Sequence, residues 1–450
     1  MTEPAQTLFD AFVQFGLLVL IGFSGWLCLR TIGRGNRIPY IYWPWLALLA
    51  LQSVSFVSLV RTTGDNSLVS APLLYKVISH ADDLRLAPAL AVLALLPLRS
   101  AAPAGLANTK VAAVWVLLFA AAILSGLVNR SAGPAVAEGL QQMAVTVVSI
   151  AAFLFGATRL PFPLVRKTIQ TLLGSLVVLS LVAYLQAPNW ALTDEWPGGF
   201  AEGPRLAGYS PQPNSLGFFA AILIVSLCAI PKLSRIYYPL IAAAIWTICL
   251  TGSRGAVAAT IFGLVALLAY RYARTAWAAM VCIGFVMAAA TPFLLGTEFL
   301  GLDTARTDTW AYSLSIWRDN MMFGAGPAQQ QYGYLETTLY SHNQMLQSLT
   351  EGGLVGGVLL VVATAMSVRK VWRSGGAIGA GVIGSLVAVF AFENYLRVSS
   401  SLFELAVAVP LVLIMAGDQI EQPDDGVPSA YEIESHRKDE IGLVEAGVRV

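Results

Sequence analysis

The sequence carries little charge. Only 12% of its 450 residues are Asp, Glu, Lys or Arg, whereas 57% are hydrophobic. Soluble globular proteins carry about twice that charged fraction, so soluble, disordered and nucleic-acid-binding proteins are all poor descriptions of this chain. The formal net charge is only +1. An anionic partner therefore has to be held by a few placed cations rather than by bulk charge.

Residues that bind metals or form disulfides are also scarce. The chain has four cysteines and three histidines, with no CxxC pair and no histidine–carboxylate cluster, so we predict neither a metal site nor a disulfide framework. A GxSxG nucleophile motif and a Walker loop are absent as well, and no cofactor is expected. The cysteines all lie in apolar runs, where they pack between helices: Cys28, Cys228, Cys249 and Cys282.

Apolar runs of membrane-spanning length recur along the chain. A spanning helix needs about 20 apolar residues, and the runs predict an all-α polytopic integral membrane protein with roughly 12–13 transmembrane helices. We expect residues 1–416 to form one transmembrane domain and the acidic tail, residues 417–450, to be disordered and cytoplasmic. The runs are Phe12–Leu29, Ile41–Val60, Leu86–Leu98, Val111–Val128, Val136–Ala157, Ile169–Leu185, Ser215–Ile230, Ile236–Leu250, Ala256–Tyr270, Ala276–Leu295, Leu354–Val368, Ile378–Leu396 and Leu402–Ala416.

Basic residues divide unevenly between the two sides of these spans. Of the 27 lysines and arginines, we assign 18 to alternate connections and the tail, and the remaining nine to the opposite side. The positive-inside rule places the richer side in the cytoplasm. On the outer side, residues 296–352 form a connection far longer than is usual in a compact domain, and such loops are commonly functional. We expect a large, helical, extracytoplasmic catalytic loop there.

Two outer arginines stand at the membrane boundary. Arg254 lies in the turn TGSRGA between two spans, where a guanidinium is costly unless it faces a polar cavity or a partner. Arg205 lies in GPRLAGYSPQPNSLG, just before the chain re-enters the membrane. The alternatives are a snorkelling, helix-capping Arg254 and an ordinary exposed loop Arg205.

A third arginine, Arg306, opens the stretch ARTDTWAYSLSIWRDN. Arg306, Trp310, Leu314 and Trp317 recur at helical spacing, which predicts a helix on the outer membrane surface. This helix either covers a lipid-headgroup site or serves as an interfacial anchor whose tryptophans mark headgroup depth.

His342 lies in YSHNQMLQSLTEGGLVGG at the end of the long loop. Ser341 and Gln344 fit a capping box, which predicts that His342 occupies the first helical position. The positive end of the helix dipole would keep the imidazole neutral there, as a general base requires. The alternative is a histidine that only satisfies a helix start.

These motifs, in this order, resemble those of the O-antigen ligase and polymerase family, which covers O-antigen ligases, polymerases of O-antigen and exopolysaccharide, and protein O-oligosaccharyltransferases. The resemblance extends from about Arg205 to Gly356. It implies a metal-independent glycosyltransferase in the bacterial cytoplasmic (inner) membrane, acting on its periplasmic side on a glycan donor linked to undecaprenyl pyrophosphate. It further implies that Arg205, Arg254 and Arg306 bind the pyrophosphate and that His342 is the catalytic base.

Several functions remain open at this point. The first expectation is polymerisation of exopolysaccharide or O-antigen repeat units onto an acceptor sugar hydroxyl. The alternatives are a ligase that moves the finished lipopolysaccharide chain onto lipid A core, and then a protein-glycosylating relative. A transporter of polysaccharide or lipid is the competing class, but it favours ionisable residues near mid-span, and here they gather at the outer face. We expect the bilayer, donor and acceptor as partners, and no nucleic acid; the sequence does not predict the oligomeric state.

Overall fold

Helices make up nearly all of the part of the chain that the structure describes, which confirms the all-α membrane fold. The computed structural model describes residues 39–58, 86–97, 106–128, 134–186, 188–193, 203–210, 212–295, 305–326, 342–374, 376–391, 393 and 404–415. The predicted span Phe12–Leu29, the tail and much of the long outer loop lie outside the described residues.

Each predicted apolar run from Ile41 onward coincides with a helix over most of its length. Five of these helices are long and apolar enough to cross a membrane on length and composition alone. The helices that match the runs are α2 (Tyr42–Ser58), α5 (Leu86–Leu95), α6 (Leu106–Val128), α7 (Pro134–Ala157), α8 (Phe162–Gln186), α10 (Pro213–Cys228), α11 (Tyr238–Thr251), α12 (Arg254–Tyr272), α13 (Arg274–Leu295), α16 (Gln344–Ser374), α17 (Ala377–Phe390) and α18 (Glu404–Met415). Shorter elements are α9 (Pro188–Ala191), η2 (Arg235–Tyr237), α14 (Ala305–Asp319) and the two paired strands β1 (Leu192–Thr193) and β2 (Arg205–Leu206).

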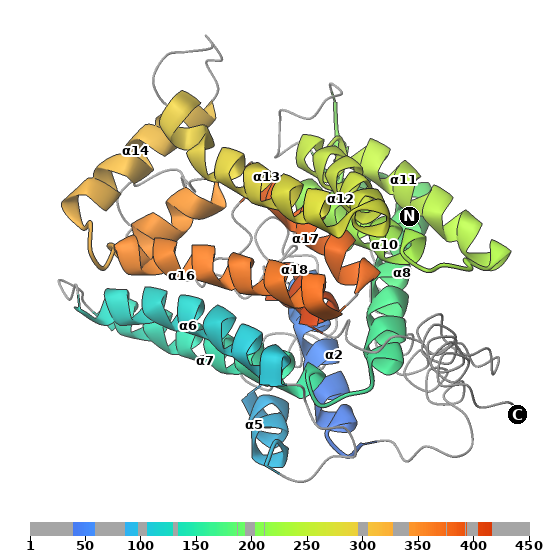
Figure 1. Cartoon of the computed structure of the whole chain (residues 1–450). Helices are drawn as coiled ribbons and strands as arrows, with labels where there is room; N and C mark the ends of the chain where they lie inside the picture. Colours follow the sequence, from blue (N-terminus) through green and yellow to red (C-terminus); the bar gives the residue numbers. More distant parts are fainter. Residues whose placement is uncertain are drawn as a thin grey trace, which may run out of the picture.

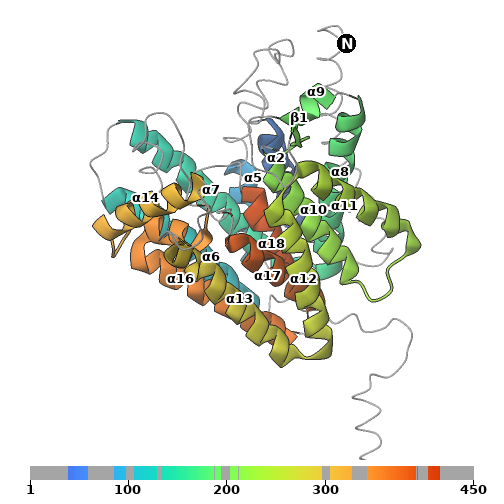
Figure 2. The ribbon, with the colours of Figure 1, turned by 90° about the horizontal axis from the view of Figure 1, so that it is seen from above.

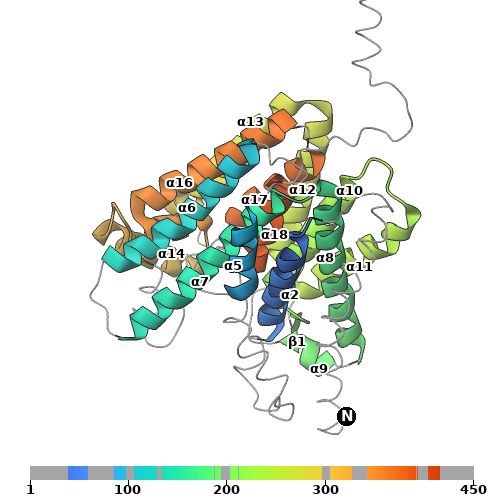
Figure 3. The same ribbon diagram turned by 90° about the horizontal axis from the view of Figure 1, so that it is seen from below.

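The helices form two groups that meet at α17 and α18. Seen from above, α8, α10, α11 and α12 lie on one side of α17 and α18, and α6, α7 and α16 lie on the other (Figure 2). From below, α6, α7 and α16 run side by side as one layer (Figure 3).

Small residues let the central helices α12 and α17 approach closely. A Cβ added at Gly263 would lie 2.2 Å from the hydroxyl of Ser385, and one added at Gly384 would lie 2.5 Å from the Cβ of Ala266. Ser385 Oγ donates across the interface to the carbonyl oxygen of Ala259 at 2.9 Å. Such small-residue contacts with an interhelical hydrogen bond are typical of helices that pack within a membrane.

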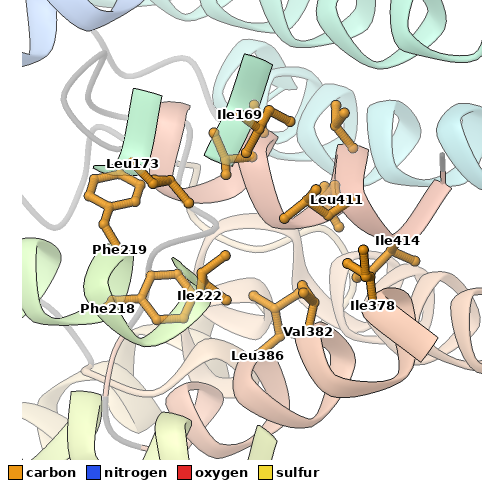
Figure 4. Close-up of a cluster of buried hydrophobic side chains, with 14 of the residues drawn as sticks. Ile169, Leu173, Phe218, Phe219, Ile222, Ile378, Val382, Leu386, Leu411 and Ile414 are labelled. Carbon is orange, nitrogen blue, oxygen red and sulfur yellow. The ribbon is translucent and has the colours of Figure 1, made fainter. Parts of the chain in front are cut away.

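One part of the hydrophobic core lies where α8, α10, α17 and α18 meet. The side chains in this cluster are branched aliphatic or aromatic and come from all four helices (Figure 4). They include Ile169, Leu173, Phe218, Phe219, Ile222, Ile378, Val382, Leu386, Leu411 and Ile414.

Hydrogen bonds between helix ends define two ends of the molecule. The first end, which we call the site end, contains the start of α10, the junction of α11 and α12, the start of α16 and the end of α17. At the opposite end, Arg271 donates to the carbonyl oxygens of Cys228 and Ala229 at 3.0 and 3.1 Å, at the end of α10. Lys370 is buried there, and its ammonium donates to the carbonyl oxygens of Ile414 and Met415, at the end of α18.

Candidate functional site

Arg205 is held by a short strand pair, and its own strand β2 lies against α11. Residue Thr193 of β1 pairs with Arg205 of β2 in an antiparallel register. Three residues later, Gly208 has a φ of +55°, and a Cβ there would lie 2.5 Å from the side chain of Ser180. Only glycine permits this backbone conformation at so close an approach. The result is that the Arg205 side chain enters the protein, where the residue is only 6% exposed.

The Arg205 guanidinium joins two helix ends. Its Nε donates to the carbonyl oxygen of Thr251 at 2.7 Å, and its Nη2 donates to Asn214 Oδ1 at 2.7 Å. Thr251 is the last residue of α11, where the helix dipole favours a cation. Asn214 lies in the first turn of α10. Arg205 therefore fixes the end of one helix against the start of another.

Arg254 begins α12 directly after a two-residue turn. Gly252 ends α11 in the left-handed conformation, with a φ of 59°. Ser253 is the N-cap of α12, and its hydroxyl oxygen accepts a hydrogen bond from the backbone N–H of Ala256 at 3.2 Å. Arg254 itself is exposed. The turn thus places an exposed guanidinium beside the N-terminal N–H groups of a helix, which is a favourable arrangement for an anion.

A buried carboxylate, Glu393, connects the two arginine segments. Its Oε1 accepts a hydrogen bond from Asn214 Nδ2 at 2.7 Å, so Asn214 bridges Glu393 and Arg205. Its Cγ lies 3.8 Å from the position of a Cβ at Gly255, next to Arg254. Because a buried carboxylate is costly without partners, this shared network explains how the charge of Glu393 is accommodated.

His342 lies at the end of this network. Its Nδ1 is 3.5 Å from Glu393 Oε2, and it forms no hydrogen bond within the described part of the chain. The His342 side chain is 31% exposed, whereas that of Glu393 is 6% exposed. A carboxylate beside one ring nitrogen of a partly exposed imidazole is a suitable arrangement for orienting a general base.

The predicted capping box at His342 is wrong. Helix α16 begins at Gln344, and Asn343 caps it, because Asn343 Oδ1 accepts a hydrogen bond from the backbone N–H of Leu346 at 3.1 Å. His342 precedes the helix and has a φ of +42°, an uncommon conformation for a residue other than glycine. Asn343 caps the helix in place of Ser341 because Asn343 is also held by tertiary hydrogen bonds. Its Nδ2 donates to the carbonyl oxygens of Ala288 and Ala391, at 2.8 and 3.4 Å. These bonds fix His342 beside the end of α17 and hence beside Glu393.

The helix predicted after Arg306 is present as α14, but its Trp310 faces the protein. Trp310 is 5% exposed, and the ring of Trp317 makes an edge contact with that of Phe293 in α13. The carbonyl oxygen of Ser313 accepts a hydrogen bond from Thr350 Oγ1 of α16 at 3.4 Å. The interpretation of α14 as a helix whose tryptophans rest in the membrane surface is therefore wrong for Trp310. The side chain of Arg306 lies outside the described residues.

The structure thus brings together three of the four predicted site residues: Arg205, Arg254 and His342. Sequence reasoning missed Glu393 and Asn214, which join them. Glu393 was detectable in principle, because it is a carboxylate within the predicted span Ile378–Leu396, and ionisable residues inside spans are usually functional. Within the described ranges, no group of three or more His, Cys, Asp or Glu residues is placed to hold a metal ion.

Comparison with known proteins supports the expected family. Residues 239–361 match the family model described as O-antigen ligase, in agreement with the resemblance seen in the sequence. The match contains Arg254 and His342, whereas Arg205 and Glu393 lie outside it. It supports, in general terms, a membrane glycosyltransferase of the O-antigen ligase and polymerase type. Searches of the curated proteins and of the solved structures found no match.

Proposed function

We propose that this protein transfers a glycan from an undecaprenyl-pyrophosphate-linked donor to an acceptor sugar hydroxyl, and that it polymerises exopolysaccharide or O-antigen repeat units. The proposal places the site end on the periplasmic face of the bacterial inner membrane, following the distribution of basic residues in the sequence. It rests on one observation above all: the hydrogen bonds that join Arg205, Asn214 and Glu393 end beside His342.

Arg254 is the main ligand of the donor pyrophosphate in this proposal. The exposed guanidinium and the N-terminal N–H groups of α12 together favour a phosphate group. The buried Arg205 adds positive charge from inside the protein. Arg306 is a third candidate ligand of the pyrophosphate. As the bond between the anomeric carbon and the pyrophosphate breaks, negative charge grows on the leaving group. The arginines stabilise that charge and supply what a metal ion supplies in other transferases.

His342 is the base in the same scheme. The acceptor hydroxyl oxygen forms the new bond to the anomeric carbon, the pyrophosphate leaves with the bonding electron pair, and the hydroxyl proton passes to the imidazole. Glu393 orients the ring through Nδ1 and stabilises the imidazolium that forms. Asn214 and Arg205 hold the carboxylate in place. General-base assistance of this kind contributes about 10² to 10⁴ in rate.

The test is a deletion strain analysed for surface polysaccharide and lipid-linked intermediates. Accumulation of single lipid-linked repeats, reversed by the wild-type gene but not by His342→Ala, is the expected result. Long lipid-linked chains together with bare core would instead assign the ligase reaction. Unchanged polysaccharide and intermediates in the deletion strain would reject both transfer reactions.

A further inference from the structure

Helix α16 is broken at Gly353, and another part of the chain repairs the break. Gly353 has φ 62° and ψ −156°, far from helical values. In an unbroken helix the N–H groups of Leu354 and Val355 would donate to the carbonyls of Thr350 and Glu351. The break turns the first stretch of α16, residues 344–352, at an angle to the rest of the helix (Figure 1).

Residues 320–326, which we call the strap, satisfy both sides of the break. Leu354 N–H donates to the carbonyl oxygen of Met321 at 2.8 Å, and Val355 N–H donates to that of Met322 at 3.4 Å. In the other direction, the strap's Ala325 and Gly326 donate their N–H groups to the carbonyl oxygens of residues 350 and 351, at 2.7 and 3.1 Å. Two donors and two acceptors freed by the break are therefore paired with one segment.

Where the strap passes Gly353, the two backbones are too close for either to carry a side chain. A Cβ at Gly353 would lie 2.4 Å from the nitrogen of Gly324, and a Cβ at Gly324 would lie 2.5 Å from the nitrogen of Gly353. Both glycines have positive φ, at 62° and 73°. By contrast, a Cβ at the neighbouring Gly352 would have no atom within 4 Å. The chain therefore offers a matched control one residue from the crossing.

The strap is also tied to two further helices. It follows α14 directly, and Asn320 Nδ2 donates back to the carbonyl oxygen of Ile316 at 3.1 Å. Ser125 of α6 is buried, and its hydroxyl donates to the carbonyl oxygen of Gly324 at 2.8 Å. The direction of residues 344–352 is therefore set jointly by α6, α14 and the long stretch of α16.

We propose that the strap is a positioning element for the transfer reaction, which holds His342 against Glu393 by fixing the direction of residues 344–352. This inference rests on the proposed function. The stretch is about 13 Å long, so a rotation of about 10° at Gly353 would move its far end by about 2 Å. A misplacement of about 1 Å can cost roughly 100-fold in rate. Asn343 fixes the end of the stretch next to His342, and the strap fixes the end next to Gly353.

The experiment compares Gly324→Ala, Ser125→Ala and Gly352→Ala, purified in lipid nanodiscs with a lipid-linked repeat donor. We expect Gly324→Ala to lower kcat about 100-fold and Ser125→Ala about 3- to 10-fold. Donor KM should stay within about twofold of wild type for both, because in the proposed function the arginines and not the strap bind the pyrophosphate. Gly352→Ala should match wild type. If Gly324→Ala does not fold, the kcat and KM of Ser125→Ala alone test the inference.

A double-mutant comparison separates positioning from general stability. If the strap acts through His342, Ser125→Ala should cause no further loss of the residual turnover in the His342→Ala background. An equal loss in both backgrounds, or identical kinetics for Gly324→Ala and Gly352→Ala, would overturn the inference. A wild-type protein that makes no product, or a His342→Ala variant as active as wild type, would instead overturn the proposed function.

Discussion

The two ends of the helix bundle use their cations differently. At the end opposite the site, Arg271 and Lys370 donate to carbonyl oxygens at the ends of α10 and α18, where the helix dipole is negative. At the site end, Arg254 is the first residue of α12, where the dipole is positive and disfavours a cation. Arg271 and Lys370 are explained by the fold alone. In the proposed function, Arg254 binds the donor pyrophosphate at this position.

Arg205 and Arg274 refine this comparison. Arg205 belongs to the site end, but it donates to the last carbonyl of α11 and so also helps the fold. Arg274 begins α13 at the opposite end, and its guanidinium carbon lies 5.3 Å from the centre of the Tyr270 ring, a cation–π partner. Arg254 is likewise exposed at a helix start, but it follows the buried Ser253, and the proposed function assigns an anion as its ligand.

The largest expected effect at the site end is that of His342→Ala. Loss of the proposed base should lower kcat by about 10² to 10⁴. Donor binding should stay near wild type, because in the proposed function the arginines hold the pyrophosphate. The measurements are steady-state turnover and a donor-binding titration on the purified protein. A fall in donor affinity with unchanged kcat would instead assign His342 to binding the pyrophosphate, and not to activating the acceptor hydroxyl.

Arg254→Ala should have the second-largest effect. A charge-assisted hydrogen bond contributes about 1.5–3 kcal/mol, so loss of one should reduce kcat/KM by about 10- to 100-fold. The control is Arg318→Ala, which removes an exposed arginine from the last turn of α14, where a cation is favoured by the dipole. Equal kinetics for the two variants would show that the comparison of cations at helix ends does not identify the anion site.

Much of the fold was predictable from the sequence because it depends on a single variable, apolar length. The runs beginning at Ile41 predicted helices that the structure contains, and the tight turn TGSRGA predicted the junction of α11 and α12. These features are local, so a window of the sequence contains the information that determines them. The same local reasoning correctly placed a helix after Arg306.

The site was predictable only in part, because its connections are not local. Asn214 and Glu393 are 179 residues apart, and their hydrogen bond was not readable from either segment. The start of α16 was misplaced for a related reason: Ser341 and Asn343 both suit an N-cap, and the choice depends on the contacts of Asn343 with α13 and the end of α17. Tertiary hydrogen bonds decided between two locally acceptable caps.

Glu393→Gln should have a smaller effect than Arg254→Ala. The glutamine oxygen can still accept the hydrogen bond from Asn214, but the amide NH₂ that replaces Oε2 cannot accept a hydrogen bond from the imidazolium at Nδ1 or stabilise its charge. We expect a loss of about 10-fold in kcat with little change in donor affinity. The matched control is Glu351→Gln, the same change at a buried carboxylate that accepts from Gln347 Nε2 at 2.6 Å. A similar loss in both variants would assign the effect to a buried charge rather than to His342.

Lys370→Met should have the smallest effect on activity. The buried ammonium donates to the last carbonyl oxygens of α18, so its loss should lower the free energy of unfolding by about 1–3 kcal/mol. Turnover per folded molecule should remain within about twofold of wild type, since the proposed chemistry lies at the other end of the bundle. Thermal unfolding in detergent and kinetics at a temperature well below the transition measure the two quantities separately. The control Arg369→Met removes the same charge from an exposed neighbour and should change neither. A loss of kcat in Lys370→Met without a loss of stability would mean that the two ends are coupled, and the division between a structural end and a chemical end would no longer hold.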